Sequence, residues 1–282
     1  METADGQQNN KHENGPPPRK QTLSKLAYFF GLAFILTVIS SQYLHPIKNP
    51  LGSFLLIYAI PAVFVTIVSG LAILKKAFRN NLAAIEWGLA SWGVLLSGSY
   101  IIDLSVFNLL FAFDPGALVS LNRSLPFSHI GLSPWFMIAL SLLVIGPAEE
   151  YLFRGFVFGG ALRAFPEQHW LLLAVLASAL FTLVHFYYFL IFGLASGIIL
   201  PDIFAIGLAM SATYYFSGGN LLIPILLHGL FDSFGFLSLA TTGGLGENMR
   251  LFMIGAGLLM AIYLARRSFL LSNHPPTSAW ET

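Results

Sequence analysis

The sequence predicts an all-α, polytopic membrane protein with about eight transmembrane helices. Two observations carry this prediction. Of the 282 residues, 56% are hydrophobic and only 10% are charged, whereas an ordinary globular domain has about 25% charged residues. The apolar residues also fall into separate runs, and a run of about 20 such residues can cross a bilayer as a helix. A single soluble core could not hide so much apolar surface, which excludes a soluble globular domain.

Charge and cysteine content exclude other classes of protein. The formal net charge of +1 gives no indication of a nucleic-acid partner. The chain has no cysteine, which excludes disulfides, thiolate metal sites and cysteine nucleophiles. Any metal ion would have to be held by His, Asp or Glu side chains.

The N-terminal part predicts a tail followed by two spans. Residues 1–22 are polar, which favours a disordered tail. The apolar runs Leu26–Leu44 and Leu51–Leu74 predict the first two helices. The second run ends in Lys75-Lys76-Ala77-Phe78-Arg79, and such a basic loop is expected on the cytoplasmic side.

The middle of the chain is harder to divide. Trp87–Ile102 predicts one span, and Asp103 interrupts the apolar run that follows, so a short interfacial helix is expected there. Asp114–Pro134 contains several turn residues and is expected to be an external loop. Trp135–Arg154 then predicts a fourth span that returns to the cytoplasm.

The C-terminal half predicts four more spans, the last of them at Leu251–Ala265, and both chain ends are then cytoplasmic. Ser217-Gly218-Gly219-Asn220 predicts a tight turn between two of these spans. The other three are expected at 170–190, 193–216 and 220–239. The expected organisation is a tail at 1–22, N-terminal transmembrane helices at 23–134, a catalytic core at 135–240, a last transmembrane helix at 241–267 and a C-terminal tail at 268–282.

The most informative stretch is Gly146–Gly155, at the end of the fourth apolar run. Glu150 and Arg154 are four residues apart, so on a helix they share one face and can pair. Glu149 is turned about 100° away. Because a charge at membrane depth costs roughly 2.5–3.5 kcal/mol by insertion scales, Glu149 is expected to have a function and the Glu150–Arg154 pair a structural one.

Two later spans also carry polar groups. His185 lies in an otherwise neutral span, past its midpoint, which is deeper than a cytoplasm-facing Glu149 would suggest. His228 and Asp232 are four residues apart and share a helix face. Gly229 would allow another helix or a ligand to approach closely, and Pro224 is expected to kink this helix.

Each polar group also has a purely structural explanation. A single histidine inside a membrane can be a hydrogen-bonded structural residue, and His228 with Asp232 could join two helices. Together, however, Glu149, His185, His228 and Asp232 form a workable hydrolytic set. They could bind a divalent metal ion such as Zn²⁺ that activates water. Otherwise Glu149 is the general base for water, while His228 and Asp232 polarise the scissile carbonyl and stabilise the oxyanion.

The motifs resemble those of the CAAX protease and bacteriocin-processing (CPBP, or Abi) family of intramembrane proteases, which includes the type II CAAX prenyl endopeptidases. The family pattern is Glu-Glu-x-x-x-Arg, Phe-x-x-x-His and His-x-x-x-Asn or Asp. In this sequence it corresponds to Glu149-Glu150 with Arg154, Phe181 with His185, and His228 with Asp232.

The resemblance implies an eight-helix bundle that encloses an intramembrane cavity open to the cytoplasm. It further implies that Glu149 activates the attacking water, that His185 positions this water, and that His228 with residue 232 stabilises the oxyanion. An ionised Asp232 would repel an oxyanion, so it is expected to orient His228, bind metal or be protonated. Its suitability as a ligand favours a metal ion, with Zn²⁺ expected.

The expected function is therefore a membrane metalloendopeptidase, in a bacterial inner membrane, that acts on a protein or peptide substrate with or without a lipid anchor. The alternative is a non-catalytic membrane scaffold or a bacteriocin self-immunity protein of the same fold. A proton-coupled transporter is less favoured, because the two halves of the chain show no repeat.

Overall fold

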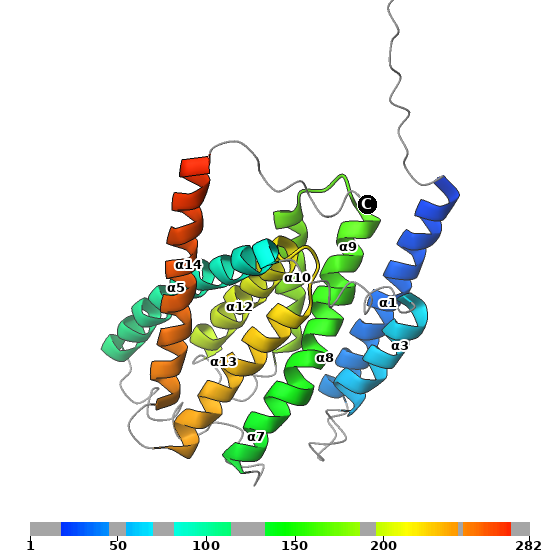
Figure 1. Ribbon diagram of the computed structural model, residues 1–282. Helices are drawn as coiled ribbons and strands as arrows, with labels where there is room; N and C mark the ends of the chain where they lie inside the picture. The colour runs from blue at the N-terminus through cyan, green and yellow to red at the C-terminus, as the bar shows by residue number, and fades with distance from the viewer. Residues whose placement is uncertain are drawn as a thin grey trace, which may run out of the picture.

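The structure is a computed structural model (Figure 1), and it describes residues 18–44, 55–69, 82–113, 133–186, 196–241 and 245–271. Every regular element in these ranges is a helix, which confirms the all-α prediction. The predicted tail segments 1–17 and 272–282, the basic cluster Lys75–Arg79 and most of the predicted external loop lie outside the described residues. The elements are α1 (Pro18–Leu44), η1 (Leu55–Ala59), α3 (Ile60–Ser69), α5 (Leu82–Phe113), α7 (Pro134–Leu140), η3 (Ser141–Ile145), α8 (Gly146–Glu150), η4 (Tyr151–Phe158), α9 (Gly159–Ala164), α10 (Trp170–Val184), α12 (Ser196–Phe216), α13 (Leu222–Ala240) and α14 (Leu245–Leu271).

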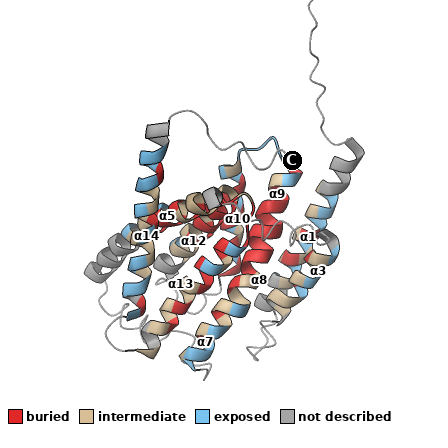
Figure 2. Ribbon diagram, viewed as in Figure 1, coloured by how far each residue is buried: buried red, intermediate tan, exposed pale blue. Residues whose placement is uncertain are grey.

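A long composite helix runs through the middle of the molecule. It joins α7, η3, α8, η4 and α9 without a break over Pro134–Ala164, and π-helical turns lie on both sides of α8. Every residue of η4 is buried (Figure 2). The prediction that this span ends at Arg154 is wrong, because the helix continues to Ala164 and Glu149, Glu150 and Arg154 are all buried within it. We call Pro134–Ala164 the central helix.

Two helices in the described part of the chain are long and apolar enough to cross a membrane. They are the central helix, with 31 residues, and Asn248–Arg267 within α14, with 20 residues. Outward-facing Leu143 on the first and Phe252 and Leu259 on the second are 69–75% exposed, as expected of side chains in contact with lipid. The number of eight spans stays a prediction.

Two N-terminal helices are longer than predicted. α5 is one helix of 32 residues, and Asp103 does not interrupt it. α1 begins at Pro18, inside the segment predicted as tail, and proline is well tolerated in the first turn, where the missing N–H would have no helical partner.

Two helices of the C-terminal half also differ from the prediction. α10 ends at Val184, so His185 caps its C-terminus instead of lying within a span. Pro224 lies in the first turn of α13, where it removes no helical hydrogen bond, so the predicted kink has no cause there. The turn between α12 and α13 is confirmed, with positive φ angles of 67° at Gly218 and 83° at Gly219 that favour glycine.

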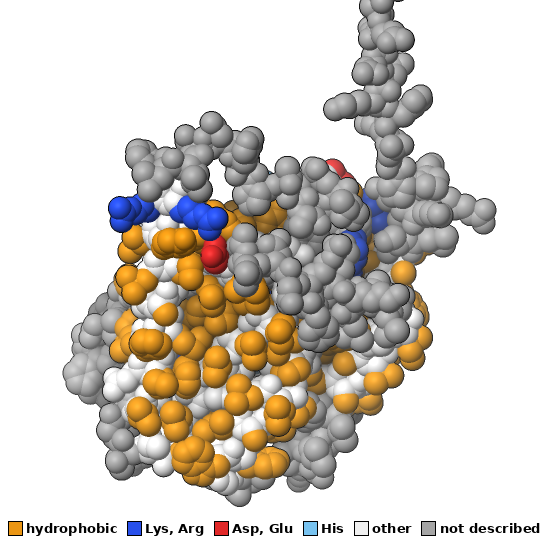
Figure 3. Space-filling view, viewed as in Figure 1, with side chains coloured by type: hydrophobic (Ala, Val, Ile, Leu, Met, Phe, Trp, Pro, Cys, Tyr) orange, Lys and Arg blue, Asp and Glu red, His pale blue; other side chains and the backbone are white. Residues whose placement is uncertain are grey.

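Charged side chains gather at one end of the helix bundle, which we call the charged end (Figure 3). Here Lys25 near the start of α1 pairs with Glu167 after α9 at 3.9 Å. Arg267 near the end of α14 pairs with Glu86 at the start of α5 at 3.2 Å. Trp170 at the start of α10 stacks on Tyr215 at the end of α12, with 4.8 Å between ring centroids. Below this end, the visible surface is mostly hydrophobic (Figure 3).

Candidate active site

Three elements bring the predicted site residues together. Glu149 and Glu150 lie on α8, His185 caps α10, and His228 lies on α13. These four residues are buried, with 0–8% of their surface exposed. The fifth residue, Asp232, lies one turn after His228, and its side chain is 31% exposed.

Glu149 and His185 lie at the same depth in the bundle. Glu149 is fifteen residues from Ala164, and His185 is fifteen residues from Trp170. Both of those helix ends belong to the charged end, so each residue lies about 22 Å along its helix from it. The depth mismatch expected from the sequence disappears because the central helix continues beyond Arg154.

Glu149 is the centre of the cluster. Its Oε1 is 3.8 Å from His185 Nε2, and its Oε2 is 3.7 Å from His228 Nε2. The hydroxyl of Tyr58, on η1, donates a hydrogen bond to Oε1. The carboxylate therefore has one imidazole beside each oxygen and a phenol beside one of them.

Both histidines are fixed through Nδ1. His185 Nδ1 is 2.8 Å from the carbonyl oxygen of Phe181, and His228 Nδ1 is 2.6 Å from Glu150 Oε1. Because a carbonyl or carboxylate oxygen only accepts, each Nδ1 is the donor. Each ring thus turns Nε2 toward Glu149. His228 Nε2 is also 3.6 Å from Asp232 Oδ2.

Arg154 binds the same oxygen of Glu150 as His228 does. Its Nη1 donates to Glu150 Oε1 at 3.0 Å, and its Nη2 donates to the carbonyl oxygen of Gly207 on α12 at 3.1 Å. The guanidinium also lies 4.5 Å from the ring centre of Phe181, a cation–π distance. The ion pair expected from the i, i+4 spacing therefore extends to α10, α12 and, through Glu150, to His228.

A close helix crossing brings His228 within reach of the carboxylates. A Cβ at Gly229 would lie 3.1 Å from Leu142 Cα and from the Ser141 carbonyl oxygen, and a Cβ at Gly146 would lie 3.2 Å from Gly229 N. Two glycines facing each other thus let the backbones of α13 and the central helix approach closely. Any larger residue at either position would push His228 away from Glu149.

The donor set fits a divalent metal ion chemically. Two Nε2 atoms and two carboxylates are ordinary zinc ligands, and zinc-bound histidines commonly donate their other ring N–H to a carboxylate or carbonyl, as His228 and His185 do here. The separations of 3.6–3.8 Å approach the roughly 3.4 Å between ligands of a tetrahedral zinc ion. In the described part of the chain, however, no group of three or more His, Asp or Glu side chains is placed so that it could hold a metal ion.

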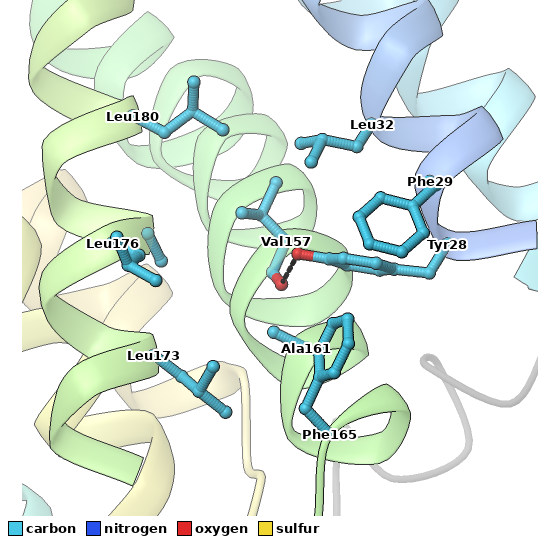
Figure 4. A pocket seen from close by; sticks show the side chains of 10 residues that line it. Tyr28, Phe29, Leu32, Val157, Ala161, Phe165, Leu173, Leu176 and Leu180 are labelled. Carbon is cyan, nitrogen blue, oxygen red and sulfur yellow. Dashed lines mark hydrogen bonds between the residues drawn. The ribbon is translucent and has the colours of Figure 1, made fainter. Parts of the chain in front are cut away.

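An apolar cavity of about 220 Å³ lies between α1, the end of the central helix and α10 (Figure 4). Tyr28 and Leu32 line it on one side, and Leu176 and Leu180 face them from α10. Its lining includes none of the predicted catalytic residues, so it is distinct from the carboxylate cluster.

Comparison with known proteins supports the resemblance seen in the sequence. Residues 131–234 match the family model described as type II CAAX prenyl endopeptidase Rce1-like. This segment is therefore similar to the CAAX protease family. The match contains all three motifs, and it implies a membrane-bound protease with a peptide substrate. No curated protein and no solved structure matches the chain.

Sequence reasoning missed two contacts of the site. Tyr58 lies in the apolar run Leu55-Leu56-Ile57-Tyr58-Ala59, far from any motif. The available signal was a hydroxyl group in an apolar span, which needs a hydrogen-bond partner there. The second contact is that of Glu150 with His228, which depends on the helix crossing at Gly146 and Gly229.

Proposed function

We propose that the protein is an intramembrane endopeptidase that hydrolyses a peptide bond with water activated by Glu149. One observation carries the proposal: the Glu149 carboxylate, 3% exposed, lies between the Nε2 atoms of two histidines that are both fixed through Nδ1. A buried carboxylate costs free energy unless it is paired or functional, and this arrangement suits a general base.

The proposed reaction needs no covalent intermediate. Glu149 takes a proton from water as the water oxygen attacks the scissile carbonyl carbon. The carbonyl π electrons move to its oxygen, and the resulting oxyanion accepts a hydrogen bond from His228 Nε2 when that nitrogen is protonated. The C–N bond then breaks as the carbonyl re-forms, and the proton held by Glu149 passes to the leaving nitrogen. A single oxyanion donor is worth roughly 10²–10³ in rate in comparable sites.

Asp232 and His185 have supporting roles in this proposal. Asp232 Oδ2, 3.6 Å from His228 Nε2, stabilises the protonated imidazole. His185 Nε2, 3.8 Å from Glu149 Oε1, lies where it can hold the attacking water against the carboxylate. The orientation of His228 comes from Glu150 rather than from Asp232, because Glu150 accepts from the other ring nitrogen.

A divalent metal ion is the alternative form of this proposal, because His228 Nε2 cannot coordinate a metal and donate a hydrogen bond to the oxyanion at the same time. Glu149, His185, His228 and Asp232 would hold it, and a bound Zn²⁺ supplies Lewis acidity that makes water a better nucleophile near neutral pH. Elemental analysis of purified wild type beside His185→Ala and His228→Ala tests this form. About one ion per wild-type chain, lost in both variants, is the expected result. Less than about a tenth of an ion per chain in an active sample would contradict it.

The proposed substrate is a peptide with a prenylated C-terminus, of the kind named by the matching family model. The probe is a farnesylated peptide that ends in Cys-a-a-X, with release of the C-terminal tripeptide measured by mass spectrometry. Glu149→Gln keeps the size of the side chain but removes the base, so the rate should fall by roughly 10²–10⁴.

Glu167→Gln is the matched control, because this carboxylate is 54% exposed at the charged end and should be silent. Equal cleavage by wild type and Glu149→Gln would exclude Glu149 as the base. A scaffold or self-immunity protein would instead show no cleavage with any of the three proteins, and a cellular phenotype that survives Glu149→Gln.

A further inference from the structure

In the described part of the N-terminal helices, three side-chain hydroxyls form hydrogen bonds to the central helix. Tyr28 on α1 donates to the Val157 carbonyl oxygen at 3.0 Å, and Thr66 on α3 shares a hydrogen bond of 2.6 Å with the Tyr151 hydroxyl. The third is the bond from Tyr58 on η1 to Glu149. All three N-terminal residues precede the segment 131–234 that matches the family. Only the third ends on a residue of the proposed catalytic set.

The local sequence explains how Tyr58 reaches the site. Proline at position 61 has no N–H and its ring clashes with the carbonyl of residue 57, so the regular i to i−4 ladder cannot run through this point. The turn just before it, Leu55–Ala59, is π-helical, and Pro61 itself is fully buried. Single π-helical turns inside α-helices often occur at functional sites, because they change the direction of one side chain.

The Tyr58 bond distinguishes the two oxygens of Glu149. Oε1 accepts from Tyr58 and lies on the His185 side, whereas Oε2 lies 3.7 Å from His228 Nε2. A carboxylate held at one oxygen cannot rotate freely about its terminal torsion, which is otherwise broad. Oε2 is therefore kept beside the imidazole that faces the developing oxyanion.

We propose that Tyr58 is a positioning residue of the catalytic site, whose hydroxyl fixes Glu149 Oε1 and so sets the orientation of the carboxylate that takes the proton from water. This inference rests on the proposed function. Its consequence is that the catalytic site is completed by a helix outside the family segment. Preorganisation of this kind acts on the chemical step rather than on substrate binding.

The first experiment compares Tyr58→Phe with two matched controls, Tyr151→Phe and Tyr28→Phe. Each variant removes one phenolic hydroxyl from the same helix interface, but only the first touches Glu149. With the farnesylated peptide, Tyr58→Phe should lower kcat about 10- to 100-fold and leave KM within about twofold. The controls should keep kcat within about threefold, since they leave the carboxylate in place. A kcat for Tyr58→Phe equal to that of the controls overturns the inference.

The second experiment is independent of activity. The infrared spectrum of wild type minus that of Glu149→Gln isolates the carboxylate bands of Glu149. These bands should shift when the same difference is taken in the Tyr58→Phe background and stay unchanged in the Tyr151→Phe background. Bands that do not move overturn the inference even if Tyr58→Phe is inactive. If wild type cleaves no peptide, the proposed function fails, and the infrared bands still decide whether Tyr58 holds Glu149.

Discussion

Glu150 Oε1 accepts hydrogen bonds from two residues, Arg154 at 3.0 Å and His228 at 2.6 Å. The first follows from a spacing of four residues on one helix and is predictable from the sequence. The second joins residues 78 positions apart and depends on how two helices cross. A pair that the sequence assigns to the fold is therefore also the support of a candidate catalytic histidine.

Arg154→Ala should destabilise the protein strongly. Arg154 is 1% exposed, and its removal leaves a buried carboxylate without its cation, which costs roughly 3–5 kcal/mol in comparable pairs. We expect a lower melting temperature in detergent and less folded protein recovered from membranes.

The matched control is Arg267→Ala, which breaks the pair with Glu86 at the charged end. The two side chains of that pair are 48% and 30% exposed, so its loss should cost only about 0–1 kcal/mol. An Arg154→Ala protein that is as stable as Arg267→Ala but inactive would contradict the structural assignment and place Arg154 in the chemistry.

At the scale of the helices, the sequence predicted most elements but placed the ends of several helices at the wrong residues. Each apolar run in the described part of the chain corresponds to a helix, because hydrophobicity over about 20 residues is a strong signal. The errors arose where charged residues were taken as the ends of spans, at Asp103 and at Arg154. Arg154 has partners on α8 and α12, and those partners cannot be read from the local sequence.

Contact between two helix backbones gives a second prediction. α5 and α14 cross at Gly93 and Gly257, where a Cβ added at Gly257 would lie 2.6 Å from Gly93 Cα. Gly257→Ala should therefore separate the helices and lower the stability by about 1–3 kcal/mol, measured by thermal unfolding in detergent.

Gly255→Ala is the control on the same helix. A Cβ there would meet nothing within 4 Å, so only the higher helix propensity of alanine remains, a gain of up to about 1 kcal/mol. A Gly257→Ala protein with a melting temperature no lower than that of wild type would contradict the close crossing of α5 and α14.

At the scale of the whole molecule, the sequence placed the motif residues in separate spans. It could not predict that the N-terminal helices contact the candidate site. Motif spacing shows which residues share a helix face, whereas the Tyr58–Glu149 contact spans 91 positions and carries no periodic signal. The ion pairs at the charged end could not be predicted from the sequence either. Lys25, Glu86, Glu167 and Arg267 are scattered through the sequence, and only the packing of the helices brings them to one side.

The proposed topology places the charged end in the cytoplasm, because basic residues are retained on that side. Since the chain has no cysteine, single cysteines can report the location of each end without any background substitution. Ser133 and Gln168 are exposed and lie just beyond opposite ends of the central helix. In intact cells, a membrane-impermeant maleimide should label Ser133→Cys and leave Gln168→Cys unlabelled, and permeabilised cells should label both. The reverse pattern would invert the orientation, and labelling of both in intact cells would show that the central helix does not cross the membrane.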